Sequence, residues 1–275
     1  MDHDRVDTAS QPYRTASRSL LRKARRAPVI LLPLGLMLLL WQLAVAMTAD
    51  SARRFLVPTP SAVASELIRL LRDGTIARHA GTTLLEMALG LALGTSVALI
   101  LGYGVAHSRF VANLLEPVIV ISQALPIVAL APLLTVWFGS GLASKVIVCA
   151  LIVFFPILIN VTSGIKGIDP RQIDLFRTLE ASRTQLLRYL EIPAALPAFL
   201  SGLKVGGTLA AMGAVVGEFV ASSRGLGYLV KQGQNLYDLP RMFAAILVLM
   251  TIASAVYGTL ALLERFLLRW KREGA

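Results

Sequence analysis

Charged residues are scarce in this chain. Asp, Glu, Lys and Arg make up 16% of its 275 residues, against about 25% in a typical soluble domain. Apolar stretches of about 20 residues, the length that crosses a bilayer as a helix, recur instead, and the mean hydropathy is +0.69. The composition therefore excludes an ordinary soluble domain and indicates one all-α integral membrane domain with a polar N-terminal tail.

Cysteine and histidine are also rare. Cys149 is the single cysteine, so no intrachain disulfide is possible, and we expect it to be a small buried apolar residue. The three histidines, His3, His79 and His107, are scattered through polar segments. This spacing predicts no metal site.

Catalytic motifs are missing as well. The chain has no G-x-x-x-x-G-K-[ST] loop for nucleotide phosphates, no H-E-x-x-H zinc motif and no G-x-S-x-G elbow. A membrane enzyme is therefore disfavoured, and we expect no cofactor in this chain. If the protein drives uphill transport, the energy must come from a partner or from an ion gradient.

Six membrane spans are predicted from the apolar stretches. The third contains Pro117, Pro126 and Pro132, so we expect it to be kinked or broken. The predicted spans are residues 28–47, 84–106, 114–138, 143–163, 194–222 and 242–268. A cleaved signal peptide is the alternative for the first stretch, but its apolar part is longer than the roughly 7–15 residues of such signals.

Basic residues orient these spans. With six spans both termini lie on one side, and a cytoplasmic N-terminus gives 17 inner Lys and Arg against four in the short outer loops, as the positive-inside rule requires. Residues 1–27 are then a cytoplasmic basic tail, and residues 28–275 are the transmembrane domain with an inner loop at 164–193. The net charge of +11 is better explained by this clustering at span ends, where anionic lipid lies, than by nucleic acid.

The outer segment 48–83 contains an amphipathic run. Val63, Leu67, Leu70 and Leu71 fall on one helical face, and Ser61 is the expected cap. We expect this helix to lie along the outer membrane surface.

Small and polar residues inside the spans predict close packing and candidate path positions. Glycines spaced by four, Gly90 with Gly94, Gly202 with Gly206 and Gly213 with Gly217, indicate packing within one subunit, with a subunit interface as the alternative. Lys204 is expected to snorkel to the inner boundary, and Glu86 also lies near a span boundary. Residues that could line a translocation path are Gln123, Pro126, Asn160 and Glu218, although interhelical hydrogen bonds, or headgroup contact for Glu218, are equally consistent with the sequence.

The inner loop carries two helix-start signals. Asp169, Pro170 and Gln172 have the spacing of a capping box with proline at the first helical position, and Ser182 with Gln185 repeats the spacing. Two short helices meeting near Ala181 are therefore predicted, which we call the elbow (residues 169–193).

The elbow resembles the cytoplasmic loop of permeases of binding-protein-dependent ABC importers. The family pattern is E-A-A, three residues, Gly, nine residues, then I-x-L-P. Here Asp174, Leu175 and Phe176 begin the pattern, and Glu180 replaces the glycine. Further matching motifs are Leu56 to Ser61, Ser122 to Pro126, Ala131 to Leu133, Val136 to Gly141, Gly217 to Phe219, Gly225 to Leu229 and Leu190-Glu191-Ile192-Pro193. Because Glu180 lacks the freedom of glycine, a more helical and differently angled elbow is expected.

The resemblance implies a type I importer permease with about six spans. It implies two permease subunits, here expected as a homodimer, an extracytoplasmic binding protein, and cytoplasmic ATPases that carry ATP and Mg and receive the elbow. The expected coupling residues are Arg171, Ile173, Asp174, Leu175, Phe176, Arg177, Leu179, Glu180, Ala181 and Ser182. Phe176 and Leu179 are the expected apolar anchors.

The match is closest to the branch that imports nitrate, sulfonates, taurine and vitamin-type heterocycles. Phe154 to Ile157 and the stretch from Gly217 to Tyr228 are most similar to its vitamin members, which carry riboflavin or the pyrimidine precursor of thiamine. The alternative function is an ion-coupled secondary carrier, which usually needs inverted repeats and ionisable residues at the midplane.

Overall fold

The computed structural model describes residues 35–36, 39–47, 57–124 and 126–269. Within these ranges the chain is helical apart from turns and short connections, and no strand occurs. It divides into two compact units, residues 1–62 and 63–275.

The first unit contains a helix over residues 39–47, so much of the predicted first span and all of the basic tail lie outside the described residues. The indole Nε1 of Trp41 donates to the carbonyl of Pro58 at 3.0 Å. Helix α2 (Pro60–Arg72) begins here, but Ser61 is not its cap. Thr59 Oγ1 accepts from the amide of Ala62 at 3.2 Å, which leaves Pro60 at the first helical position, where a missing N–H costs nothing.

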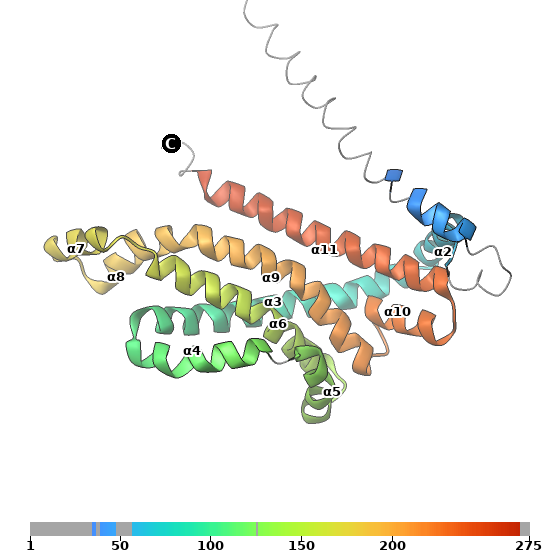
Figure 1. The fold of residues 1–275 in the computed structure, drawn as a ribbon, viewed down its shortest axis with the longest axis horizontal. Coiled ribbons are helices and arrows are strands. Elements are labelled where there is room, and N and C mark those ends of the chain that lie inside the picture. The colour runs from blue at the N-terminus through green and yellow to red at the C-terminus, as the bar shows by residue number, and fades with distance from the viewer. Residues whose placement is uncertain (1–34, 37–38, 48–56, 125, 270–275) are drawn as a thin grey trace, which may run out of the picture. The chain divides into compact units, whose positions relative to one another are not determined.

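The second unit is a bundle of long helices (Figure 1). Helix α6 contacts both α3 and α9, and the elbow helices α7 and α8 lie at one end of the unit, with α10 at the other. The elements are α3 (Thr75–His107), α4 (Arg109–Ala124), α5 (Ile127–Phe138), α6 (Leu142–Lys166), α7 (Pro170–Thr178), α8 (Arg183–Leu186), the π-helical turn η1 (Leu187–Glu191), α9 (Ile192–Ala221), α10 (Leu226–Asn235) and α11 (Leu239–Leu267).

Four helical segments in the described part of the chain are long and apolar enough to cross a membrane: α3, α6, α8 to α9, and α11. These correspond to the second, fourth, fifth and sixth predicted spans. Helix α3 begins nine residues before the predicted start at 84. Ile76 and Thr83 are buried against the bundle, and their packing stabilises the first turns of the helix although these turns are rich in polar residues. Helix α10 was not predicted as a separate element.

The third predicted span is broken, as expected. Helix α4 ends at Ala124 and α5 begins at Ile127, with Pro126 in an extended conformation between them. Proline lacks a backbone donor and restricts the residue before it. Pro117 and Pro132 remain inside their helices, so only the central proline coincides with the break.

Small residues let α3 and α9 approach α6 closely. A Cβ on Gly213 would stand 2.7 Å from the Cα of Cys149, and one on Gly94 would stand 2.7 Å from the carbonyl oxygen of Ala150. The predicted glycine pairs on α3 and α9 all face α6 of the same chain. They therefore serve packing within the subunit, which in a membrane relies on close contact between helices.

The core of the unit forms along this seam. Cys149, Val153 and Ile157 of α6 are fully buried with Ala210 and Ala214 of α9. The Cys149 thiol donates to the carbonyl of Ala210 at 3.4 Å, so the single cysteine is buried, as the sequence predicts.

On α2, Val63 and Leu70 are buried, but Leu71 is 55% exposed. The predicted apolar face of α2 is therefore buried within the protein only in part, and its position along the membrane surface stays a prediction.

Candidate functional site

The elbow consists of two short helices with well-defined starts. Asp169 accepts from the amide of Arg171 at 2.9 Å, with Pro170 at the first helical position of α7. Ser182 and Gln185 form a reciprocal capping box at α8, with bonds of 3.3 Å and 2.7 Å. The two predicted helix starts are therefore confirmed, and the chain turns between Leu179 and Ser182.

The turn between the two helices is a Schellman motif. The amide of Ala181 donates to the carbonyl of Phe176, and the amide of Glu180 donates to that of Arg177, both at 3.0 Å. Glu180 has φ +53°, in the left-handed region that glycine normally occupies. The expectation of a more helical elbow is therefore wrong: the capping bonds hold glutamate in the conformation that glycine would adopt.

On α7 and at its C-terminal end, the exposed apolar side chains are Leu175 and Leu179, at 57% and 69%. They are four residues apart and so lie on one helical face. Ile173 and Phe176 are partly buried, which makes Phe176 a less accessible anchor than the sequence suggests. Arg177 and Asp174 form an ion pair at 3.2 Å on the surface, and Arg171 and Ser182 are also exposed.

The elbow is continuous with a membrane helix. Residues 183–221 form one helical segment of 39 residues, in which the π turn η1 joins α8 to α9. A π turn inside an α-helix widens one turn and is frequent at functional sites. Because no flexible linker intervenes, a displacement of α8 is transmitted directly to α9.

The base of the elbow is fixed to α3. His107 Nε2 lies 2.8 Å from Glu191 Oε1, and Leu190 and Glu191 are both buried. The sequence motif Leu190-Glu191-Ile192-Pro193 therefore marks the point where the elbow meets the bundle. No sequence pattern predicts this role for His107, because its partner is 84 residues away.

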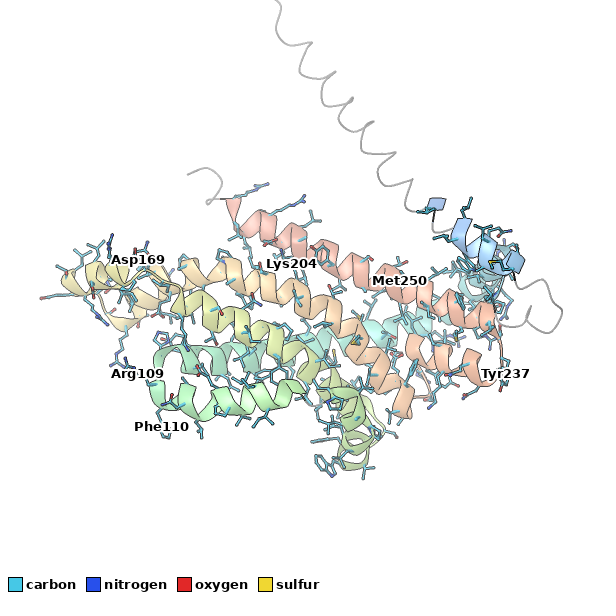
Figure 2. All side chains as sticks on the ribbon, viewed as in Figure 1. Arg109, Phe110, Asp169, Lys204, Tyr237 and Met250 are labelled. Atoms are coloured by element: carbon cyan, nitrogen blue, oxygen red, sulfur yellow. The ribbon has the colours of Figure 1, made fainter. Side chains whose placement is uncertain are left out.

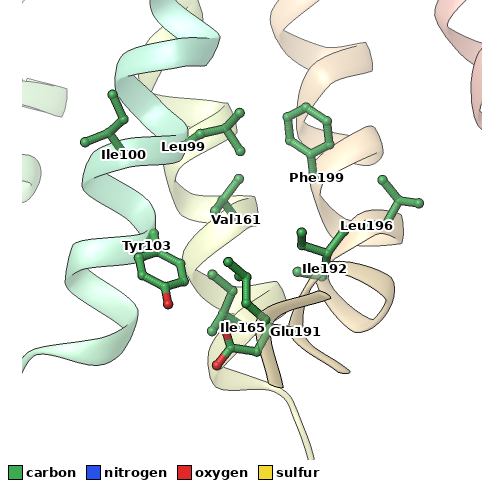
Figure 3. Close-up of a pocket in the computed structure, with 11 residues that line it drawn as sticks. Leu99, Ile100, Tyr103, Val161, Ile165, Glu191, Ile192, Leu196 and Phe199 are labelled. Atoms are coloured by element: carbon green, nitrogen blue, oxygen red, sulfur yellow. The ribbon is translucent and has the colours of Figure 1, made fainter. Parts of the chain in front are cut away.

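An apolar groove lies beside this contact (Figure 3). It has a volume of about 560 Å³ and lies between α3, α6 and the start of α9. Tyr103, Ile165 and Phe199 line it with Glu191 at one end. Movement of η1 would change the shape of this groove, since Leu187 and Glu191 of η1 belong to its wall.

A buried polar cluster lies toward the other end of the bundle. Lys145 Nζ lies 3.1 Å from Glu86 Oε1 and donates to Ser222 Oγ at 2.8 Å. Glu86 is fully buried and Lys145 is 8% exposed. A buried charge without its partner is strongly destabilising, so this pair ties α3 and α6 together.

Glu218 belongs to the same cluster and caps α10. Its carboxylate accepts from Thr83 Oγ1 at 2.6 Å and from the amides of Gly227 and Tyr228. Thr83 Oγ1 in turn accepts from the amide of Leu226 at 2.8 Å. These partners satisfy the free donors at the start of α10, where the helix dipole also favours a negative charge.

Two glycines make this cap possible. Gly225 has φ +115°, and a Cβ there would overlap the Glu218 carboxyl. A Cβ at Gly227 would stand 2.8 Å from Glu218 Oε2. The sequence motifs around Glu218 and Gly225 therefore meet in one contact, at the start of α10. The sequence could not reveal this contact, because it depends on how the chain folds between α9 and α10.

The proposed path residues occupy different environments. Pro126 is exposed at the break between α4 and α5, while Gln123 lies where only the backbone is described. Asn160 donates to the carbonyl of Pro156 at 2.8 Å and packs on Gly202. Glu218 is fully buried and so makes no headgroup contact in this conformation.

Lys204 is paired with a carboxylate from α11. Its Nζ donates to Glu264 Oε2 at 2.6 Å, which joins α9 to α11; the predicted snorkelling of Lys204 stays a prediction. Figure 2 shows Lys204 on α9 between the elbow, marked by Asp169, and the opposite end, marked by Tyr237. Among the residues with described positions, no group of three His, Cys, Asp or Glu side chains could hold a metal ion.

The four long apolar helical segments, one of them continuous with the elbow, indicate a multi-pass membrane protein. The chain belongs to the family described as binding-protein-dependent transport system inner membrane component, whose model matches residues 90–269. It is therefore a permease subunit of an ABC importer and a protein of the inner membrane.

Individual relatives agree with this membership. The chain is 45% identical over 246 residues to the riboflavin transport system permease protein RibX of Chloroflexus aurantiacus, covering 89% of this chain and 91% of that protein. It is 32% identical to the formylaminopyrimidine transport permease protein ThiX of Halalkalibacterium halodurans, covering 86% and 94%. The fold is similar to a chain of the MetNI methionine ABC transporter in inward-facing conformations, with a TM-score of 0.62, 19% identity and coverage of 70% and 95%.

Proposed function

We propose that this permease forms the translocation path for a vitamin-type heterocycle, riboflavin or the pyrimidine precursor of thiamine, handed over by an extracytoplasmic binding protein. The names of the relatives similar over most of the chain support this substrate class. Sulfonates, taurine and nitrate are the alternatives within the same branch. Binding measurements on the cognate binding protein with labelled riboflavin, thiamine precursor and taurine distinguish them.

The elbow is the proposed coupling element. Leu175 and Leu179 form an exposed apolar pair that suits insertion into a groove on a cytoplasmic ATPase, with Arg171, Asp174 and Arg177 as rim contacts. Ile173, Phe176, Glu180, Ala181 and Ser182 shape and support the turn. The observation that carries this proposal is the unbroken helix from α8 through η1 to α9, which makes the elbow a lever.

ATP and Mg are proposed to bind the partner ATPase. ATP can shift the transporter between two conformations only if it binds one of them more tightly than the other. A second copy of this chain would complete the path, which we place beside the α4–α5 break at Gln123 and Pro126. For the fully buried Glu218, a path role would require another conformation, whereas Asn160 is only partly buried. Both termini are proposed to be cytoplasmic, from the excess of basic residues on the elbow side.

The proposal is tested by reconstitution. Vesicles containing the permease alone should show no concentrative uptake, whereas vesicles that also hold the ATPase and binding protein should show ATP-dependent uptake. Concentrative uptake by the permease alone, driven by an ion gradient, would instead support a secondary carrier.

A further inference from the structure

A polar pocket lies at the end of the second unit opposite the elbow. It has a volume of about 410 Å³ and is bounded by the start of α3 and the loop before α10. Two arginines, three hydroxyls and one imidazole surround it. These residues are Thr75, Arg78, His79, Thr82, Ser223 and Arg224.

Within the described residues, the two arginines of this pocket form no ion pair, whereas two neighbouring arginines do. Arg69 pairs with Glu66 at 2.5 Å, and Arg241 lies 3.3 Å from Asp238. The Arg69 guanidinium accordingly holds the pKa of Glu66 below its usual value.

Arg78 and Arg224 have no carboxylate within 4.0 Å in the part of the chain that the structure describes. The neighbouring carboxylate, Asp73, accepts from the amide of Thr75 at 2.9 Å and lies 3.9 Å from Arg69. Arg78 also interacts electrostatically with Asp73 from beyond ion-pair distance. Two guanidiniums that face one pocket with no described carboxylate in ion-pair contact favour an oxyanion, because their planar donors match phosphate geometry.

The surface of α3 continues from the pocket as an apolar stripe. Thr75, Arg78 and Thr82 are spaced by three and four residues and share one helical face. The same spacing extends this face through exposed apolar side chains. These are Leu85, Leu89, Leu93 and Val97, which are 39% to 50% exposed.

The end of the stripe farther from the pocket borders a second cavity. Leu93 and Val97 line an apolar groove of about 230 Å³ with Ala150, Leu151 and Phe154 of α6. From Arg78 to Leu93 the helix rises about 22 Å at 1.5 Å per residue. This is somewhat more than half of a hydrocarbon core of about 30 Å, so an acyl chain anchored at Arg78 would reach the groove.

We infer that this face of α3 is a binding site for one anionic phospholipid of the leaflet away from the elbow. Arg78 and Arg224 hold the phosphate, with the hydroxyls of Thr75, Thr82 and Ser223 as further partners. The acyl chains follow Leu85 and Leu89 toward the groove at Leu93. A free oxyanion would use the pocket alone, whereas the alignment of basic pocket and apolar stripe on one helix favours a lipid.

The test uses the thermal unfolding midpoint of the purified full-length permease in detergent. A thiol-reactive dye reports unfolding, because the single cysteine, Cys149, is buried in the folded protein. Phosphatidylglycerol, phosphatidylcholine or inorganic phosphate is titrated in separate arms. Phosphatidylglycerol is expected to raise the midpoint in a saturable way, and the other two are expected to have little effect.

Substitutions distinguish the binding of the lipid headgroup from the binding of the acyl chains. Each of Arg78→Ala and Arg224→Ala should weaken the response to phosphatidylglycerol about fivefold, and the double variant about thirtyfold. Leu89→Ala with Leu93→Ala should weaken the lipid response while leaving the arginine pocket intact. Arg72→Ala is the matched control, since Arg72 is exposed on α2 and does not line the pocket.

Several results would overturn the inference. One is no midpoint shift with phosphatidylglycerol in the unsubstituted protein, and another is an unchanged shift in the double arginine variant. An equal shift with inorganic phosphate would reassign the pocket to a free oxyanion. The readout involves neither uptake nor ATP hydrolysis, so a failure here is distinct from a failure of the proposed transport function.

Discussion

His107 Nε2 and Glu191 Oε1 lie 2.8 Å apart and connect the last turn of α3 to the π turn at the base of the elbow. Glu191 is 7% exposed, so few alternative partners can reach it. The contact fixes the base of the elbow to α3, a helix outside the elbow. It therefore bears on stability and, under the proposed function, on coupling to the ATPase.

Removing the imidazole should loosen the base of the elbow. His107→Ala leaves the buried Glu191 carboxylate without this partner, at a cost of about 1–3 kcal/mol. We expect a lower unfolding midpoint and reduced substrate-stimulated ATP hydrolysis, measured in the assembled transporter. His107→Gln, which keeps a donor, should recover part of both. Wild-type stability and coupling in His107→Ala would show that the contact is dispensable.

The exposed leucines of the elbow should anchor the ATPase. Leu179→Ala is expected to weaken ATPase binding by about 2 kcal/mol, the usual effect of truncating a desolvated anchor, or roughly thirtyfold in affinity. Leu175→Ala should act in the same direction, and Phe176→Ala, the anchor predicted from sequence, should have a smaller effect because its side chain is partly buried. Binding of purified ATPase to the reconstituted permease measures all three.

The control for these substitutions is Leu71→Ala. Leu71 is 55% exposed but lies on α2, far from the elbow in sequence. It should leave ATPase binding unchanged. If Phe176→Ala abolished binding while Leu179→Ala did not, the anchor would be Phe176, one of the two residues that the sequence predicts.

The left-handed turn at Glu180 should be improved by glycine. A side chain at φ +53° costs about 1–2 kcal/mol relative to glycine. Glu180→Gly should therefore strengthen the turn, and Glu180→Val should weaken it. Hydrogen exchange of the Ala181 amide, whose bond to Phe176 closes the turn, should slow by roughly five- to thirtyfold in the glycine variant, since 1.4 kcal/mol is tenfold. Faster exchange in that variant would contradict the assignment.

The buried pair Glu86 and Lys145 should show strong coupling. Lys145→Met leaves Glu86 without its 3.1 Å partner and should destabilise the protein by about 3–5 kcal/mol. Combining it with Glu86→Gln removes the stranded charge and should recover much of that loss, which a double-mutant cycle measures by thermal unfolding. Additive effects of the two substitutions would mean that the pair does not interact.

Much of the fold was determined by local sequence. The long apolar stretches are the membrane helices, Pro126 coincides with the break between α4 and α5, and Asp169 and Ser182 start the two elbow helices. These features depend on hydrophobic length, on a missing backbone donor, and on side chains that reach amides two or three residues away. Such causes act within one or two helical turns, so the sequence displays them directly.

The tertiary structure alone decided which distant groups meet. It placed His107 on Glu191, Lys145 between Glu86 and Ser222, and Thr83 on Glu218. It also held Glu180 in a left-handed turn where the sequence suggested more helix, because two capping bonds outweigh the local preference of a glutamate. Contacts between residues 59 to 135 positions apart depend on how the helices pack against one another, and a hydrophobic pattern specifies which residues are buried without specifying their partners.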